Sequence, residues 1–187
     1  MEDRKSTHGE ISGEQLTPDT VLGLHRMLVE GTLDDPAEAG RLETPDHTRV
    51  TAWDQDIQVH VPPPAEELPL RLQELCDFAN GAEGAYLPPA VRAVIIHFMV
   101  GYDHYFVDGN GRTARALSYW NMLHEGCCLR EYVTISRILR KVPSKYAVSY
   151  LYTEDNDSDV AYFIHYQLEV FLRALDYLDA YLLAKSQ

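Results

Sequence analysis

The sequence predicts an all-α domain that carries one small β-hairpin. Apolar residues recur at helical spacing through most of the chain, and two short runs within residues 47–61 have the pattern of paired strands. The 187 residues, of which 45% are hydrophobic and 24% charged, are enough for one domain with its own core. We therefore expect a single domain over residues 19–187, preceded by a loosely held lead-in over residues 1–18.

The first half of the chain contains two helical patterns with the hairpin between them. Apolar residues share one face from Thr20 to Glu30, and Gly31 is a suitable stop. The hairpin is expected at about residues 47–61. Three consecutive prolines then forbid a helix until the second pattern begins, which runs from Ala65 to Asn80.

The second half is expected to be helical to its end. A helix that begins at Pro88-Pro89 is apolar on most sides, which places it at the centre of the domain. A glycine-bearing turn, residues 108–111, separates it from a helix that runs to about Glu125. The remaining predicted helices are two short ones near Ile135–Arg140 and Ser144–Tyr152 and a long one from about Asp159 to Ala184.

The composition narrows the class of function. A formal net charge of −13 argues against a general nucleic-acid binder, because phosphate backbones are held by patches of Lys and Arg. No apolar run is long enough to span a bilayer. The three cysteines, with Cys127 and Cys128 adjacent, lack the spacing of a structural disulfide or a zinc site. We expect a cytoplasmic protein that binds neither nucleic acid nor membranes.

Residues 104–115, HYFVDGNGRTAR, combine a glycine-rich turn with the start of a helix. Exposed main-chain N–H groups at a helix N-terminus favour an anion, and Gly109 and Gly111 let phosphate oxygens approach the backbone closely. Asn110 adds an amide donor. Arg112 and Arg115 lie one turn apart, where both can reach the same polyanion. The pattern predicts a site for a phosphate-bearing ligand.

Two further residues in this stretch add chemistry. Histidine has an unperturbed pKa near neutrality, which suits His104 to take a proton from a hydroxyl group. Asp108 supplies a hard oxygen ligand of the kind that Mg²⁺ accepts beside phosphates and water. Taken alone, His104 is an ordinary helix-terminal histidine and residues 108–111 are an ordinary turn. The paired arginines that follow favour the functional interpretation.

The same stretch resembles the signature of the Fic family, H-x-F-x-[DE]-G-N-G-R-x-x-R. Every fixed position is met, by His104, Phe106, Asp108, Gly109, Asn110, Gly111, Arg112 and Arg115. The likeness extends from about residue 40 to residue 171 and includes the hairpin, which is similar to the family's flap. The resemblance implies the Fic fold, a helical bundle with a small β-hairpin flap.

By this resemblance the chain is expected to be a protein adenylyltransferase, which transfers AMP from ATP to a Ser, Thr or Tyr hydroxyl of a target protein. ATP would be the co-substrate and Mg²⁺ the metal, held by Asp108, while His104 would be the catalytic general base. Phe106 would anchor the loop in the core. The remaining nucleotide-binding residues implied are Gly109, Asn110 and Gly111 for the α-phosphate, Arg112 for the β-phosphate, Arg115 for the γ-phosphate, and Tyr146 on the nucleotide side.

The expected partner is a target protein that docks on the flap as an added strand. An antitoxin or self-association is left open. Two alternatives to adenylyl transfer also stay open: transfer of another nucleotide or of phosphate, and a catalytically weak nucleotide-binding or interaction module. Residues 109–112 favour AMP, because the phosphate-transferring relatives similar to Doc alter this part of the loop.

The chain departs from the family pattern at three places. Proline usually stands where this chain has Tyr105, so either His104 is less well held or the tyrosine ring fills the gap by packing. An Arg is common shortly after a Gly ahead of the flap, whereas Glu43 follows Gly40 here and reverses the local charge. Many members carry an inhibitory helix of pattern [ST]-x-x-x-E-[GN]. Residues 6–10 fit its first five positions, and Ile11 departs from the sixth.

Overall fold

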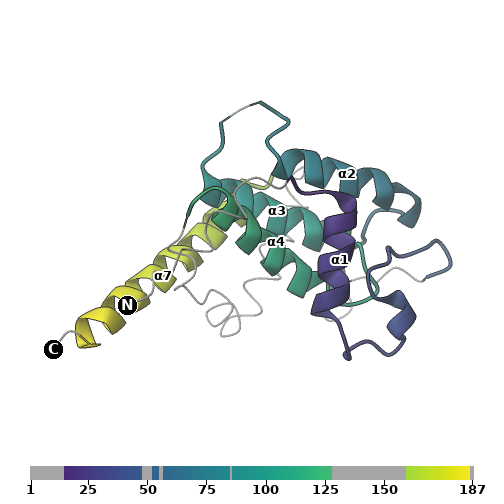
Figure 1. Cartoon of the computed structure of the whole chain (residues 1–187), viewed down its shortest axis with the longest axis horizontal. Coiled ribbons are helices and arrows are strands. Elements are labelled where there is room, and N and C mark those ends of the chain that lie inside the picture. The colour runs from purple at the N-terminus through teal and green to yellow at the C-terminus, as the bar shows by residue number, and fades with distance from the viewer. Residues whose placement is uncertain (1–14, 48–51, 55–56, 85, 128–158, 186–187) are drawn as a thin grey trace, which may run out of the picture.

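In the computed structural model of the chain, the described residues are 15–47, 52–54, 57–84, 86–127 and 159–185, and most of them are helical (Figure 1). The predicted all-α class is confirmed. The helices expected near residues 135–140 and 144–152 lie outside the described residues. No described helix is long and apolar enough to cross a membrane.

Helix α1, Pro18–Leu28, begins on a strong local signal. The hydroxyl of Thr17 accepts a hydrogen bond from the main-chain N–H of Thr20, and Pro18 occupies the first turn, where no N–H is needed. Val21 and His25 are buried one turn apart on its inner face. After α1 the chain makes a short 3-10 helix, η2, Pro36–Glu38.

Helix α2, Leu68–Ala79, follows a 3-10 turn, η3, Ala65–Glu67. Its apolar residues recur at helical spacing and are buried against α3: Leu68, Leu72, Leu75, Cys76 and Ala79. They form the main core together with Ile96, Val100, Phe106 and Leu117. The core therefore lies between α2 and the pair of helices that follow.

Helix α3, Pro89–Asp103, is the central element, because α2, α4 and α7 all pack against it. Helix α4, Asn110–His124, returns along α3, and α1 lies against α4 (Figure 1). This arrangement fits the prediction that the helix apolar on most sides is central. It also places the turn between α3 and α4 beside α1.

Helix α7, Ala161–Lys185, packs on α3 through its first turns. Phe163 is fully buried against Phe98, with ring centroids 5.1 Å apart. The C-terminal part of α7 extends beyond the other helices (Figure 1). Several large apolar side chains of that part are exposed, among them Leu172, Tyr177, Tyr181 and Leu183.

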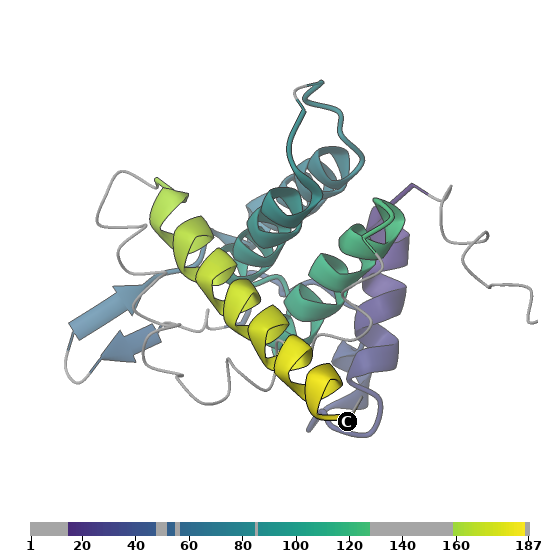
Figure 2. The same cartoon turned by 90° about the vertical axis from the view of Figure 1, so that its left-hand side faces the viewer.

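Two short antiparallel strands, β1, Ala52–Asp54, and β2, Ile57–His60, lie within the range expected for the hairpin. They project from the body of helices (Figure 2). At the end of β2, the Nε2 atom of His60 lies 2.8 Å from the carbonyl oxygen of Tyr102, which ties the strand to α3. The role of these strands as a docking flap remains a prediction.

Candidate active site

His104 lies at the C-terminal end of α3 in a left-handed conformation, with φ 50° and ψ 63°. Among the described residues it is the only one other than glycine with a positive φ. Such a conformation costs about 1–3 kcal/mol and persists only where the surroundings enforce it. The main-chain N–H of His104 still bonds to the carbonyl of Val100, so the helix ends here and the chain turns sharply. The side chain stays partly exposed, at 23%.

Asn110, the first residue of α4, braces this turn from inside. Its side chain accepts a hydrogen bond from the N–H of Phe106 and donates one to the carbonyl of the same residue. Its amide nitrogen also lies 3.2 Å from Nδ1 and 3.3 Å from Nε2 of His104. The amide is buried, and it fixes both the loop backbone and the place of the imidazole. The contact of Asn110 with an α-phosphate remains a prediction.

The N-terminus of α4 is open to a ligand. Gly109 precedes it with φ 84° and supplies no side-chain cap. The N–H of Arg112 donates to the carbonyl of Gly109, which leaves the N–H groups of Asn110 and Gly111 without a partner in the described part of the chain and available to an anion. A Cβ atom at Gly109 would lie 2.5 Å from Cγ1 of Val29 and 3.1 Å from Nε2 of His25. Both the positive φ and this close approach to α1 require glycine.

His25 is a site residue that sequence reasoning missed. Its ring stacks on Phe106, and its Nδ1 accepts a hydrogen bond from the N–H of Gly40. Because Nδ1 accepts, the proton of the neutral ring is on Nε2, which lies 2.9 Å from the carbonyl oxygen of Asp108 and donates to it. Burial lowers the pKa of His25, and the bond to Asp108 opposes this only in part. The sequence feature that could have identified His25 is its position one turn after Val21 on an apolar helix face.

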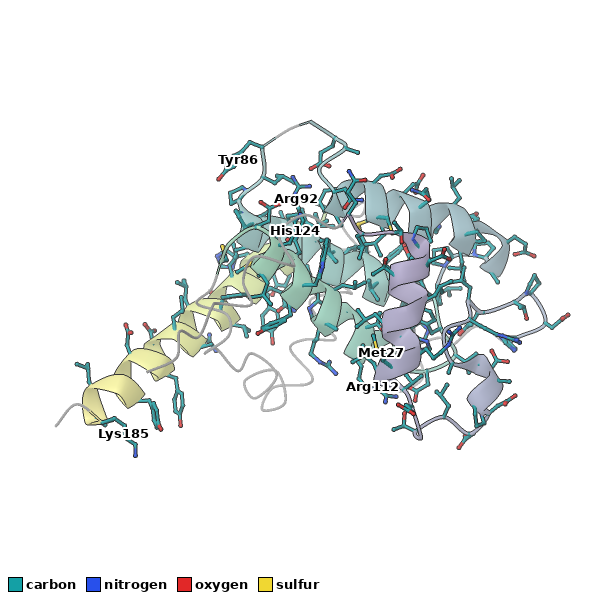
Figure 3. The ribbon with its side chains drawn as sticks, viewed as in Figure 1. Met27, Tyr86, Arg92, Arg112, His124 and Lys185 are labelled. Carbon is teal, nitrogen blue, oxygen red and sulfur yellow. The ribbon has the colours of Figure 1, made fainter. Side chains whose placement is uncertain are left out.

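The two arginines of the stretch have different surroundings. Arg112 is anchored to the end of α1, where it donates to the carbonyl of Leu28 and to the hydroxyl of Thr32 (Figure 3). It also pairs with Asp108, with 3.1 Å between Nη2 and Oδ2. Arg115 bends back over the helix start, since its Nη1 lies 3.4 Å from where a Cβ of Gly111 would be. The guanidinium of Arg115 is thus next to the open N-terminus.

Asp108 fits the predicted Mg²⁺ ligand in its chemistry. Its side chain is 64% exposed; Oδ1 accepts from the N–H of Gly109, and Oδ2 faces Arg112. The described residues hold no cluster of three or more His, Cys, Asp or Glu side chains able to bind a metal. One exposed carboxylate suits Mg²⁺, which takes its other ligands from water and substrate phosphates.

Tyr105 occupies the core. It is fully buried, and its hydroxyl donates to Oδ2 of Asp103 at 2.6 Å, while Arg71 pairs with Oδ1 of the same carboxylate at 3.2 Å. Burial, with the nearby Asp103 carboxylate, raises the pKa of Tyr105 far above its usual range. Of the two outcomes considered for the missing proline, the structure shows packing by the tyrosine ring.

Glu43 lies beside His104. It is 4% exposed, its N–H donates to the carbonyl of Tyr105, and its Oε1 is 3.9 Å from Nδ1 of His104. The sequence marked Glu43 as a departure from the family pattern but did not place it in the site. Tyr146 and the possible inhibitory segment at residues 6–10 lie outside the described residues.

A cavity of about 300 Å³ lies between the end of α1 and η2. Its lining residues include Met27, Val29, Leu33 and Pro36, and no residue of 104–115. The predicted phosphate site at the start of α4 is therefore separate from this cavity.

Comparisons with known proteins agree with one another. A sequence model of the Fic/DOC family matches residues 15–122. Protein adenylyltransferase fic-1 of Caenorhabditis elegans is 32% identical over 117 residues, which cover 60% of this chain and 20% of that protein. Protein adenylyltransferase Fic of Nematostella vectensis is 35% identical over 104 residues, which cover 56% of this chain and 22% of that protein. The chain thus spans about a fifth of the length of these curated relatives.

The fold is also similar to solved structures. A Fic family protein from Desulfovibrio desulfuricans G20 superposes with a TM-score of 0.70 at 25% identity, covering 91% of this chain and 48% of that one. Fic-1 from C. elegans superposes with a TM-score of 0.66 at 26% identity, covering 92% of this chain and 44% of that one.

Proposed function

The chain belongs to the Fic/DOC family, and on that premise we propose that it is a protein adenylyltransferase. It transfers AMP from ATP to a Ser, Thr or Tyr hydroxyl of a target protein. The names of its relatives, which are protein adenylyltransferases, support this choice. The observation that carries the proposal is that the imidazole of His104 lies 3.2 Å from the side chain of Asn110, the first residue of a helix with an open N-terminus.

The reaction needs a base and an anion site next to each other. The target hydroxyl oxygen attacks the α-phosphorus and forms the new P–O bond, while the bond to the bridging oxygen breaks and pyrophosphate leaves. His104 accepts the hydroxyl proton. The N–H groups at the start of α4 hold the α-phosphate, where negative charge gathers as the reaction proceeds. Asp108 would hold Mg²⁺, which would neutralise part of the phosphate charge.

The two arginines bind the β- and γ-phosphates, which leave as pyrophosphate. Arg112 contacts the β-phosphate through Nη2, which now pairs with Asp108, while its Nη1 stays bonded to α1. Arg115, beside Gly111, contacts the γ-phosphate. Most of the work is positioning and charge stabilisation, which rigid anchoring of Arg112 favours. The proposal also includes Tyr146 as a contact of the nucleotide. It includes the hairpin as the surface on which the target protein docks.

The test is incubation of the full chain with Mg²⁺ and ATP labelled at either the α- or the γ-phosphate, in a lysate and alone. We expect protein-bound label from α-labelled ATP only. The label should disappear in His104→Ala and persist in His165→Ala, a change at a histidine whose side chain is 78% exposed.

Two other results would contradict the proposal and identify the alternatives. Protein-bound label from the γ-phosphate indicates phosphate transfer. Nucleotide binding with no protein-bound label indicates a binding module. Label that survives in His104→Ala would remove His104 from the base role.

A further inference from the structure

A buried carboxylate stands next to the proposed base. The side chain of Glu43 is 1% exposed, and its Oε1 lies 3.9 Å from Nδ1 of His104. Removing a carboxylate from water costs several kcal/mol, about the scale of a small domain's whole stability, unless nearby groups favour its charge. A carboxyl group buried beside a titratable ring can act on the protonation of that ring, which points to a role for the pair.

The backbone fixes Glu43 at this place from both sides. Its own N–H donates to the carbonyl of Tyr105, the residue that follows His104. Three residues earlier, the N–H of Gly40 donates to His25 on α1. Gly40 has φ 74°, and a Cβ there would lie 2.7 Å from the carbonyl oxygen of Leu22. The segment 40–43 is thus pinned between α1 and the turn, so the carboxylate approaches the ring from a set direction.

The approach to Nδ1 selects one form of the imidazole. The amide N–H of Asn110 can donate to whichever ring nitrogen is unprotonated, since it lies 3.2 Å from Nδ1 and 3.3 Å from Nε2, so it does not select a tautomer. A carboxylate near Nδ1 favours the form with the proton on Nδ1, in which Nε2 carries the lone pair that accepts a proton. It also stabilises the imidazolium that forms when Nε2 accepts one, as an acidic residue behind a catalytic histidine does in hydrolases. At 3.9 Å the pair is within ion-pair distance and beyond hydrogen-bond distance, and catalytic contacts of this kind commonly shorten when substrate is bound.

We propose that Glu43 is a positioning residue that holds His104 in the Nδ1–H form and stabilises its imidazolium during transfer. It acts through His104 and touches neither nucleotide nor target. The inference rests on the proposed function for its effect on rate, but its effect on the imidazole is independent of any activity.

The first measurement is the ¹⁵N NMR spectrum of the histidine-labelled protein, with the His104 signals identified by their loss in His104→Ala. We expect Nδ1 protonated and Nε2 unprotonated at pH 8. In Glu43→Leu the Nε2–H form should gain population, and Glu43→Gln, which keeps the shape and an oxygen acceptor, should lie between. An unchanged tautomer in both variants would overturn the proposal, whether or not the protein transfers AMP.

The second measurement is the rate. Glu43→Gln should lower kcat about tenfold, and Glu43→Leu further, within the range of about 10²–10⁴ that a positioned base contributes. The KM for ATP should stay within about twofold, because Glu43 does not reach the nucleotide. Rates equal to wild type in both variants would contradict the role in transfer.

Asp103→Asn is the matched control. Asp103 is as buried as Glu43 and precedes His104, but its carboxylate binds Arg71 and Tyr105. If loss of any buried carboxylate loosens the turn, Asp103→Asn will shift the His104 tautomer as much as Glu43→Gln, and the proposal fails. We expect Asp103→Asn to lower the melting temperature and leave the tautomer unchanged. If wild-type protein transfers no AMP, the proposed function fails, and the tautomer measurement alone decides on Glu43.

Discussion

His25 stacks face to face on Phe106, with ring centroids 3.7 Å apart and planes 3° apart. The two residues come from α1 and from the turn that carries His104. The same imidazole bonds to Gly40 and to the carbonyl of Asp108. One buried side chain therefore joins three segments that surround the proposed phosphate site.

His25→Phe keeps the stacking ring and removes both hydrogen bonds. The N–H of Gly40 and the carbonyl of Asp108 then lose their partner, and each unpaired buried group costs about 1–3 kcal/mol. We expect the free energy of unfolding to fall by about 2 kcal/mol or more in urea titrations at pH 8. The exposed His165→Phe should change it by less than about 0.5 kcal/mol. Equal losses in the two variants would contradict this account.

The same residue predicts a pH dependence. Burial lowers the pKa of His25 below its ordinary value of 6.5. As the pH falls through 6.5, the unfolded chain binds a proton that the folded protein does not. The contribution of neutral His25 to the free energy of unfolding is therefore fully present above pH 6.5. It is lost as the pH falls from 6.5 toward the pKa of His25 in the folded protein. Between pH 7.5 and pH 5.5, the free energy of unfolding should fall less in His25→Phe than in wild type. The same loss in both would show that other groups are responsible.

Gly109→Ala should destabilise the turn by two separable effects. The positive φ costs an alanine about 1–2 kcal/mol, and its Cβ would meet Cγ1 of Val29 at 2.5 Å. Val29→Ala removes that atom, so the double variant should recover the steric part and keep the backbone part. A double-mutant cycle in urea measures the coupling, which we expect to be about 1 kcal/mol in the favourable direction. A coupling near zero would mean that Val29 does not limit the site.

Tyr105→Phe removes the hydroxyl that donates to Asp103. Burial raises the pKa of Asp103, and the Tyr105 hydroxyl and Arg71 oppose that rise. Loss of the hydroxyl leaves a buried carboxylate with one fewer donor, so we expect a loss of about 1–3 kcal/mol in thermal or urea unfolding. Tyr86→Phe, at a side chain that is 86% exposed, should have almost no effect. A Tyr105→Phe protein as stable as wild type would show that the ring alone fills the place of proline.

Arg115→Leu tests the proposed contact between Arg115 and the γ-phosphate of ATP. We expect ATP affinity to fall about tenfold or more, as for loss of a hydrogen bond to a charged group, while AMP affinity stays unchanged. Calorimetric titration with both nucleotides measures the difference, and Arg173→Leu on α7, 60% exposed, is the control. Equal losses for ATP and AMP would place Arg115 away from the γ-phosphate.

Some of the site could be predicted because it is local. Residues 104–115 are contiguous, and a positive-φ glycine followed by a helix start fixes an open N-terminus with little help from elsewhere. Periodicity likewise placed α1, α2, α3 and α4 within about two residues at most ends. The roles of the individual site residues remain predictions.

The sequence by itself determined the helical class and the order of base, turn and arginines, because neighbours along the chain set both. Only the tertiary structure decided that His25 would support the turn from 83 positions away, and that Glu43 would stand against the Nδ1 atom of His104. Periodicity marks a buried face, but it does not say which residues meet there. That choice depends on how α1 packs against the start of α4, with close contact at Gly109, and on how the segment after α1 packs back onto α1, with close contact at Gly40.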